Sequence, residues 1–141
     1  KGSQFIDPQM QALHDKGAIE YRRLEGVSPD AMPALVADAD IVIDQLVLGL
    51  YSVMAVQGMC AGRVVVAHVA DRVRERIGRD LPIAEATPET LTTVIERLIS
   101  ERDEARSFAT RGTSFAHDMH DGRRSAGVLA PFFDRPLRTA A

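Results

Sequence analysis

Apolar residues recur along this chain in two alternating patterns. In the first, they are spaced three or four positions apart, which brings their side chains to one face of a helix. Phe5, Ile6, Met10 and Leu13 show this spacing. The pattern predicts helices over residues 5–16, 29–39, 53–60, 71–77, 88–99, 106–118 and 122–133.

The second pattern is a short run of consecutive or alternating apolar residues, which is typical of β-strands. Residues 41–43 and 64–67 are unbroken apolar runs, as expected for parallel strands that are covered on both faces. Residues 18–24 alternate apolar with charged positions and predict a half-buried strand, and residues 81–84 predict a short edge strand. Because strands alternate with helices, we expect an α/β sandwich with a mainly parallel sheet.

Two tripeptides have the composition of a helix start. They are Ser28-Pro29-Asp30 and Thr87-Pro88-Glu89. A hydroxyl residue at the cap, a proline in the first turn and an acidic residue near the positive end of the helix dipole are all favoured there. We therefore expect helices to begin at both tripeptides.

Composition and charge narrow the class of protein. The 141 residues suffice for one domain with a sizeable core. The 17 Lys and Arg residues against 20 Asp and Glu residues give a net charge of −3, which argues against electrostatic binding of nucleic acid. The single cysteine, Cys60, excludes an internal disulfide and a multi-cysteine zinc site, and we expect it to be a small buried hydrophobe.

No part of the chain has the pattern of a targeting or membrane-spanning segment. The amino terminus lacks the apolar run of a signal peptide. Residues 45–62 carry no charge, but they include three glycines, and we expect them to belong to the core rather than to span a membrane. A cytoplasmic location is therefore expected.

Parallel α/β sheets bind their ligands at the carboxyl ends of the strands. These ends precede the loops after Leu24, Asp44 and His68. The loop after Asp44 passes through Gly49 into a predicted helix, whose free N–H groups and positive dipole end favour a phosphate. The chain contains neither of the two glycine-rich phosphate-binding motifs, G-x-G-x-x-G and G-x-x-x-x-G-K-[ST]. The residues alone therefore leave a phosphate site and an ordinary loop as alternatives. His68 is a candidate to line the site, and Asp44 is expected to cap the following loop.

The segment around this loop carries a family resemblance. It reads Asp44-Gln45-Leu46, Gly49, Tyr51-Ser52-Val53, Ala55 and, over residues 57–66, Gln-Gly-Met-Cys-Ala-Gly-Arg-Val-Val-Val. It resembles the carboxy-terminal donor-binding lobe of group 1 (family 4-type) GT-B glycosyltransferases. Similar matches extend over nearly the whole chain, at residues 1–3, 24–30, 81–83, 87–91 and 117–129.

The resemblance implies a fold and a function. The fold is a three-layer sandwich with a mainly parallel Rossmann-like sheet, one lobe of a GT-B fold. The function is retaining transfer of a sugar from a nucleotide-sugar donor to an acceptor, without a metal or other cofactor. The implied partners are the donor and the amino-terminal lobe of the same protein, with no nucleic acid and with any membrane contact made through that other lobe.

The resemblance also assigns roles to residues of this sequence. The donor diphosphate would be bound by Lys1 and by the stretch formed by Gly49, Tyr51, Ser52 and Val53. Gln57 would bind the donor ribose. The loop of Glu25, Gly26 and Val27 would lie near the base. The resemblance assigns no catalytic residue within residues 1–141.

Two departures from the family pattern leave a second interpretation open. Gln57 stands where the family has a glutamate, and Ser52 stands where it has a glycine. An amide offers the ribose hydroxyls one acceptor and one donor group in place of a carboxylate's two strong acceptors. The alternative is therefore a non-catalytic α/β binding or interaction module with a degenerate nucleotide site. For Tyr51 the alternative is core or rim packing, and for Gln57 a hydrogen bond to a neighbouring strand.

The resemblance implies a domain organisation as well. Residues 1–133 correspond to the lobe, and residues 134–141 to a frayed tail. The first strand of the family's lobe would lie upstream of Lys1, and the acceptor site would lie on the other lobe. We therefore expect the 141 residues alone to be inactive as a transferase.

Overall fold

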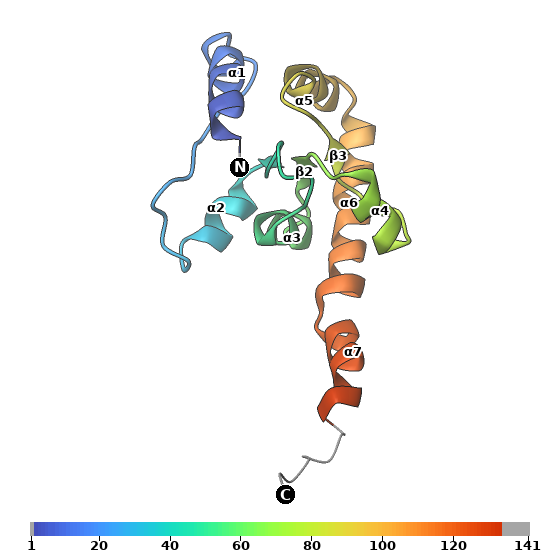
Figure 1. The fold of residues 1–141 in the computed structure, drawn as a ribbon. Helices are drawn as coiled ribbons and strands as arrows, with labels where there is room; N and C mark the ends of the chain where they lie inside the picture. Colours follow the sequence, from blue (N-terminus) through green and yellow to red (C-terminus); the bar gives the residue numbers. More distant parts are fainter. Residues whose placement is uncertain (1, 134–141) are drawn as a thin grey trace, which may run out of the picture.

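A computed structural model describes residues 2–133 of the chain (Figure 1). It contains seven helices and three strands among the described residues. The helices are α1 (Ser3–Asp15), α2 (Met32–Asp38), α3 (Val53–Cys60), α4 (Asp71–Ile77), α5 (Leu91–Ser100), α6 (Arg102–His120) and α7 (Arg123–Phe133). The strands are β1 (Ile41–Ile43), β2 (Val64–Ala67) and β3 (Ala84–Glu85).

The three strands form one parallel sheet in the order β1-β2-β3. Val42 pairs with Val65, and Val66 in turn pairs with Ala84. Parallel neighbours need a crossover connection, which α3 supplies between β1 and β2, and α4 between β2 and β3. The predicted α/β class and parallel sheet are confirmed, as is the edge position of the last strand.

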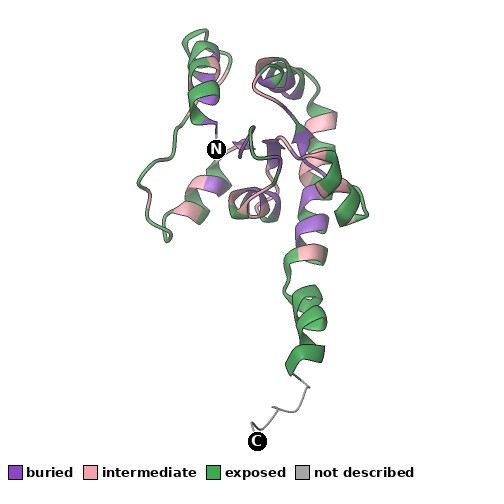
Figure 2. Ribbon diagram, in the orientation of Figure 1, coloured by how far each residue is buried: buried purple, intermediate pink, exposed green. Residues whose placement is uncertain are grey.

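Strand β2 lies between two hydrophobic clusters. Val64 and Val66 pack with apolar residues of α1 and α5, whereas Val65 and Ala67 pack with apolar residues of α3 and α6. This division follows from the strand geometry, because successive side chains point to opposite faces of a sheet. All four residues of β2 are buried, and Figure 2 shows buried residues concentrated around the sheet.

Two glycines allow α3 to pack closely between the sheet and α6. A Cβ atom on Gly58 would lie 3.0 Å from Val65 Cγ2 and 3.3 Å from Val42 Cβ. On the other side of the helix, a Cβ atom on Gly112 of α6 would lie 3.2 Å from Met59 Cγ. Because both sites lack a side chain, Met59 fits between the two layers with none of its surface exposed.

The carboxy-terminal part of the described chain leaves the core. Helix α6 packs against α3 and β2, and α7 continues beyond its end (Figure 1). Every residue of α7 is exposed, as Figure 2 shows. The predicted frayed tail, residues 134–141, lies outside the described residues.

The strand predicted over residues 18–24 is wrong. This segment forms no strand and does not join the sheet. Its apolar side chains, Ile19 and Tyr21, pack on the cluster that includes α1. The Tyr21 hydroxyl donates to Asp7 at 2.6 Å, and its backbone N–H donates to His14 Nδ1 at 3.2 Å. The alternation of apolar and charged residues therefore reflects packing against α1. The His14 side chain accepts the Tyr21 N–H, which in a strand would pair with a neighbouring strand.

The helix starts predicted from the two tripeptides are displaced. Residues 28–31 form a turn, closed by the Ala31 N–H donating to the Ser28 carbonyl at 3.1 Å, and α2 begins only at Met32. The Thr87 N–H likewise donates to Thr90 Oγ1 at 2.9 Å, and α5 begins at Leu91. Both tripeptides thus form the turn before the helix, since their hydrogen bonds close locally.

Two further boundaries differ from the prediction. β3 occupies Ala84–Glu85 rather than 81–84, because the Ile83 N–H donates to the Leu81 carbonyl at 2.8 Å in a tight turn. Helix α6 begins at Arg102 rather than 106, with Asp103 and Glu104 in its first turn, where acidic side chains favour the helix dipole. No helix within residues 2–133 is long and apolar enough to cross a membrane.

The tight packing of α3 predicts a large effect of truncating Met59. We expect Met59→Ala to lower the free energy of unfolding by about 2–5 kcal/mol, because it leaves a cavity in a closed core. Val53, on the same helix, is 73% exposed. Val53→Ala should therefore change stability by less than about 0.5 kcal/mol. Urea unfolding followed by circular dichroism measures both variants, and equal losses would contradict the described packing.

Candidate functional site

Two buried polar residues follow β1 at the carboxyl edge of the sheet. Asp44 and Gln45 are each 5% exposed. The backbone pairing of the sheet continues beyond the strands, because the His68 N–H donates to the Gln45 carbonyl at 2.9 Å. The loop after β1 therefore lies beside the loop after β2.

Asp44 and Gln45 hold the loop that leads into α3. The Asp44 carboxylate accepts the Ser52 N–H at 2.8 Å and the Ser52 Oγ–H at 2.6 Å. Ser52 Oγ in turn accepts the Met54 N–H at 3.1 Å and caps the helix. The Gln45 side-chain amide donates to the Leu50 carbonyl at 2.8 Å. The expected capping role of Asp44 is confirmed, and the loop is fixed at both ends.

Gly49 serves the packing between the two loops. Its backbone has a φ of 67°, and a Cβ atom there would lie 3.0 Å from the Cβ of Ala70. The Gly49 carbonyl accepts the Ala70 N–H at 3.1 Å. The positive φ and the close contact with Ala70 are thus sufficient to require glycine at position 49, whether or not a phosphate approaches the loop.

The side chain of Tyr51 belongs to an aromatic cluster with α6. Its ring packs edge-on against Phe115, with 6.4 Å between centroids, and against His120, with 5.7 Å. Its hydroxyl lies 3.2 Å from His120 Nε2. Burial raises the pKa of Tyr51 and lowers the pKa of His120, which favours the neutral form of both groups. The Tyr51 side chain is therefore a packing residue, as the alternative interpretation had it. Only the Tyr51 backbone could contact a diphosphate.

One stripe of α3 faces away from the core. Val53, Gln57 and Cys60 are exposed and lie at positions i, i+4 and i+7 of the helix. The expected burial of Cys60 is wrong, because Cys60 continues the face that begins at Val53. Among the described residues the Gln57 side chain forms no hydrogen bond, so the alternative interpretation, a bond to a neighbouring strand, is wrong. The Gln57 amide is accessible from solvent.

The start of α1 lies against the same loop. Lys1, the predicted diphosphate ligand, is outside the described residues. Its neighbour Gly2 is buried, and a Cβ atom there would lie 3.1 Å from Val47 Cγ2 and 3.8 Å from Leu46 Cβ. Helix α1 has no side-chain cap and no acidic residue in its first turn. Two helix N-termini, with their partial positive charges, therefore lie at the loop of residues 44–52.

The predicted base-proximal residues lie in the exposed segment before α2. Glu25 and Gly26 are exposed and Val27 is half-buried. Glu25 forms an ion pair with Arg23 at 3.0 Å. Within the described part of the chain, no hydrogen bond or ion pair joins residues 25–27 to the loop or to Gln57.

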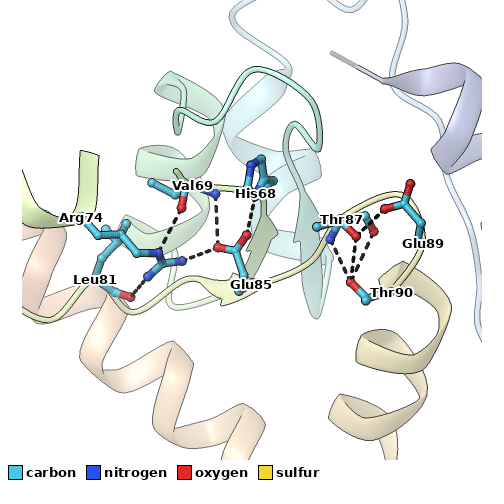
Figure 3. Close-up of polar contacts among 8 residues, drawn as sticks. All are labelled: His68, Val69, Arg74, Leu81, Glu85, Thr87, Glu89 and Thr90. Carbon is cyan, nitrogen blue, oxygen red and sulfur yellow. Dashed lines mark hydrogen bonds and ion pairs between the residues drawn. The ribbon is translucent and has the colours of Figure 1, made fainter. Parts of the chain in front are cut away.

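A second polar cluster lies at the ends of β2 and β3 (Figure 3). His68 Nδ1 is 2.5 Å from Glu85 Oε1, while Glu85 Oε2 accepts the Val69 N–H at 3.2 Å and an Arg74 N–H at 2.5 Å. Arg74 also donates to the carbonyls of Val69 and Leu81. Burial opposes ionisation of Glu85, but the hydrogen bonds from His68 and Arg74 outweigh it and lower its pKa.

This cluster lines an open cavity of about 660 Å³ between α4, β3, α5 and α6. Three arginines line it, and each is paired with a carboxylate: Arg74 with Glu85, Arg97 with Glu104 and Arg111 with Asp80. His68 was a candidate from its place at the strand end. Arg74 and Glu85 were missed, although a charged residue ending an edge strand is a signal that could have identified Glu85.

Neither cluster has the composition of a metal site. Within residues 2–133 there is no group of three or more His, Cys, Asp or Glu side chains placed to hold a metal ion.

Comparison with protein-family models, with curated proteins and with solved structures finds no match to this chain.

The hydrogen bonds of Ser52 predict a specific loss of stability. Ser52→Ala removes the helix cap and leaves a buried carboxylate acceptor unpaired, which should lower the free energy of unfolding by about 2 kcal/mol. Ser52→Thr keeps the hydroxyl and should lose less than about 1 kcal/mol. Thermal or urea unfolding compares them, and a similar loss in both variants would contradict the pairing with Asp44.

The lowered pKa of Glu85 predicts a pH dependence. Its folded-state pKa lies below the ordinary value of 4.5, so its ionised form contributes stability above that pH and loses the contribution as the pH falls further. Glu85→Gln should be less stable than the parent near neutral pH, and the difference should shrink on acidification below 4.5. Urea unfolding over this range measures it. Glu75→Gln, at an exposed position of α4, is the control; an equal, pH-independent change in both variants would contradict the role of Glu85.

Proposed function

We propose that this chain is the donor-binding lobe of a retaining glycosyltransferase and that it binds a nucleotide-sugar. The observation that carries the proposal is the start of α1 beside the loop that leads into α3, at the carboxyl edge of a parallel sheet. Free N–H groups at helix starts and the associated dipoles favour a diphosphate. The family resemblance of the sequence over the same loop supports this interpretation independently.

The diphosphate would contact backbone rather than side chains at α3. The N–H of Val53, the first helical residue, lacks an intrahelical acceptor, and the residue is exposed. The N–H groups of Ser52 and Met54 are already used by Asp44 and Ser52 Oγ. The Asp44 carboxylate would also oppose an anion at this helix start, so the proposed site needs a cation nearby. By the resemblance, Lys1 supplies it.

The ribose would bind at Gln57. This side chain lies one turn beyond Val53 on the exposed stripe of α3. Its amide offers ribose hydroxyls one acceptor oxygen and one NH₂ donor group. Because a neutral amide binds a hydroxyl less strongly than a carboxylate does, the proposed site is weaker than one with glutamate at this position.

The proposed architecture is one lobe of a GT-B fold, a three-layer sandwich with a Rossmann-like sheet. The parallel strand order and the packing of helices on both faces of β2 support it. In this proposal the lobe orients the donor, and the backbone amides together with Lys1 stabilise the departing diphosphate. A second lobe positions the acceptor and excludes water on closure, so the 141 residues alone do not transfer sugar.

A non-catalytic binding module is the second candidate. The observation that favours it is the engagement of the predicted site by the protein itself. The Asp44 carboxylate accepts both the N–H and the Oγ–H of Ser52, and Gly49 packs against Ala70. In that case the same loop is a structural element, and its resemblance to a donor site reflects a degenerate nucleotide site.

Restoring a carboxylate at position 57 separates the two candidates. If Gln57 faces a ribose, Gln57→Glu should tighten the binding of a nucleoside diphosphate roughly fivefold, because hydrogen bonds to charged groups are stronger by about 1 kcal/mol. Isothermal titration calorimetry with UDP, GDP and ADP measures the change. Thr93→Glu adds the same charge at an exposed position of α5 and should leave affinity unchanged.

The opposite results would favour the binding module. If Gln57→Glu and the parent bind no nucleoside diphosphate, or if both glutamate variants change affinity equally, the ribose-binding role of position 57 is wrong.

A further inference from the structure

The cavity beside β3 is formed by different residues from the proposed donor site. It has a volume of about 660 Å³, and no residue of the loop of residues 44–52 lines it. His68 follows β2 and Glu85 ends β3, so the cavity reaches the carboxyl edge of the sheet (Figure 3). Parallel α/β sheets bind ligands at this edge, and a cavity of this size accommodates a small organic molecule.

Two of the three arginines that line the cavity have unused hydrogen-bond donors. Each side-chain nitrogen of Arg74 already donates, to two backbone carbonyls and to Glu85. Among the described residues, neither terminal nitrogen of Arg97 and only one terminal nitrogen of Arg111 forms a hydrogen bond or ion pair. Both side chains are 44% exposed. Guanidinium groups with unused terminal N–H groups bind the oxygens of a phosphate or a carboxylate.

Contacts with α6 hold these two guanidinium groups in place. Arg97 Nε lies 3.1 Å from a Glu104 carboxylate oxygen. The Arg111 guanidinium lies 5.0 Å from the centroid of the Phe108 ring, and its Nε donates to Ser107 Oγ at 3.3 Å. Because these contacts do not occupy the unused N–H groups, an anion binds two side chains that are already ordered and loses less affinity to their immobilisation.

The carboxylates around the cavity determine which charge it accepts. Asp71, Asp80 and Glu85 balance the three lining arginines. Both Glu85 oxygens already accept hydrogen bonds. Asp80 pairs with Arg111 but is 71% exposed, so it can turn into solvent at small cost, because an exposed ion pair contributes little. A cation would face three arginines with only Asp71 unpaired among the described residues, whereas an anion can replace Asp80.

We propose that this cavity binds a small phosphomonoester. Its phosphate replaces Asp80 beside Arg111 and accepts hydrogen bonds from the terminal N–H groups of Arg97 and Arg111. A phosphate is favoured over a carboxylate, because its three terminal oxygens and nearly two charges engage two guanidinium groups at once. Its organic part lies against the apolar lining, which includes Leu81 and Ile83. This proposal does not depend on the function proposed for the loop before α3.

Titration of the full chain with phenyl phosphate tests the proposal. At about 0.1 M salt, phenyl phosphate should bind saturably and shift the side-chain Nε–H signals of Arg97 and Arg111 in NMR spectra. Inorganic phosphate should bind about tenfold more weakly, because it has no apolar part to bury. Phenol, which lacks the phosphate, should not bind at the same concentration.

Substitutions separate binding in the cavity from a general effect of charge. Arg97→Gln and Arg111→Gln should each weaken binding of phenyl phosphate at least about tenfold, because each removes charge-assisted hydrogen bonds. Arg106→Gln removes the same charge from a 78% exposed position of α6 and should leave affinity unchanged. Asp80→Asn should tighten binding by up to about fivefold, because it removes the carboxylate that competes for Arg111.

The opposite results overturn the proposal. All four substituted side chains are at least 44% exposed, so the variants keep the core intact, and circular dichroism checks their folding. The phosphomonoester site is wrong if phenyl phosphate does not bind saturably at about 10 mM, a concentration that detects even a weak site. It is equally wrong if inorganic phosphate binds as tightly as phenyl phosphate, if Arg106→Gln weakens binding as much as Arg97→Gln, or if Asp80→Asn weakens it.

Discussion

Burial of β2 on both faces is the constraint on which the rest of this structure depends. Its four residues divide between two hydrophobic clusters, so α1 and α5 lie on one face of the sheet and α3 on the other, while α6 packs on both clusters. Burial of a valine side chain contributes about 1.5–3 kcal/mol, and β2 buries three. The positions of the helices follow from this strand. Gly58 and Gly112 then set how closely α3 can approach β2 and α6. As a consequence, the starts of α1 and α3 come to the same loop at the carboxyl edge.

Polar residues hold this edge in place without completing a site. Asp44, Gln45 and Ser52 fix the loop before α3, and Arg74 and Glu85 fix the loop after β2. These groups satisfy backbone donors and acceptors that loops leave unpaired. What stays accessible is the exposed stripe of α3 with Gln57 and the start of the helix. A surface of this geometry is expected to bind a ligand largely through backbone N–H groups. In the proposed donor lobe, the diphosphate is therefore placed at the helix starts.

Much of the fold could be predicted from the sequence, because long apolar periods and unbroken apolar runs depend mainly on burial. Strands 41–43 and 64–67 and helices 53–60 and 71–77 match the structure at both ends. The errors arose where a local hydrogen bond decided the outcome. Tyr21 donates to His14 instead of a strand, and Thr90 closes a turn before α5. At the candidate site, the place of Gly49 and Ser52 in the loop was predictable. The contact of Gly49 with Ala70 and the packing of Tyr51 on His120 depend on residues distant in sequence and were not.

A nucleotide titration followed by NMR of the amides tests the donor-lobe proposal most directly. The protein would be titrated in turn with UDP, GDP and ADP. We expect one of them to shift the amide signals of Val53, Gln57 and the first residues of α1, because these residues surround the proposed diphosphate and ribose positions. If none of the three shifts these signals, or if the shifts map to the cavity lined by His68, Arg74 and Arg111, the donor site is not at the start of α3 and the proposal is contradicted.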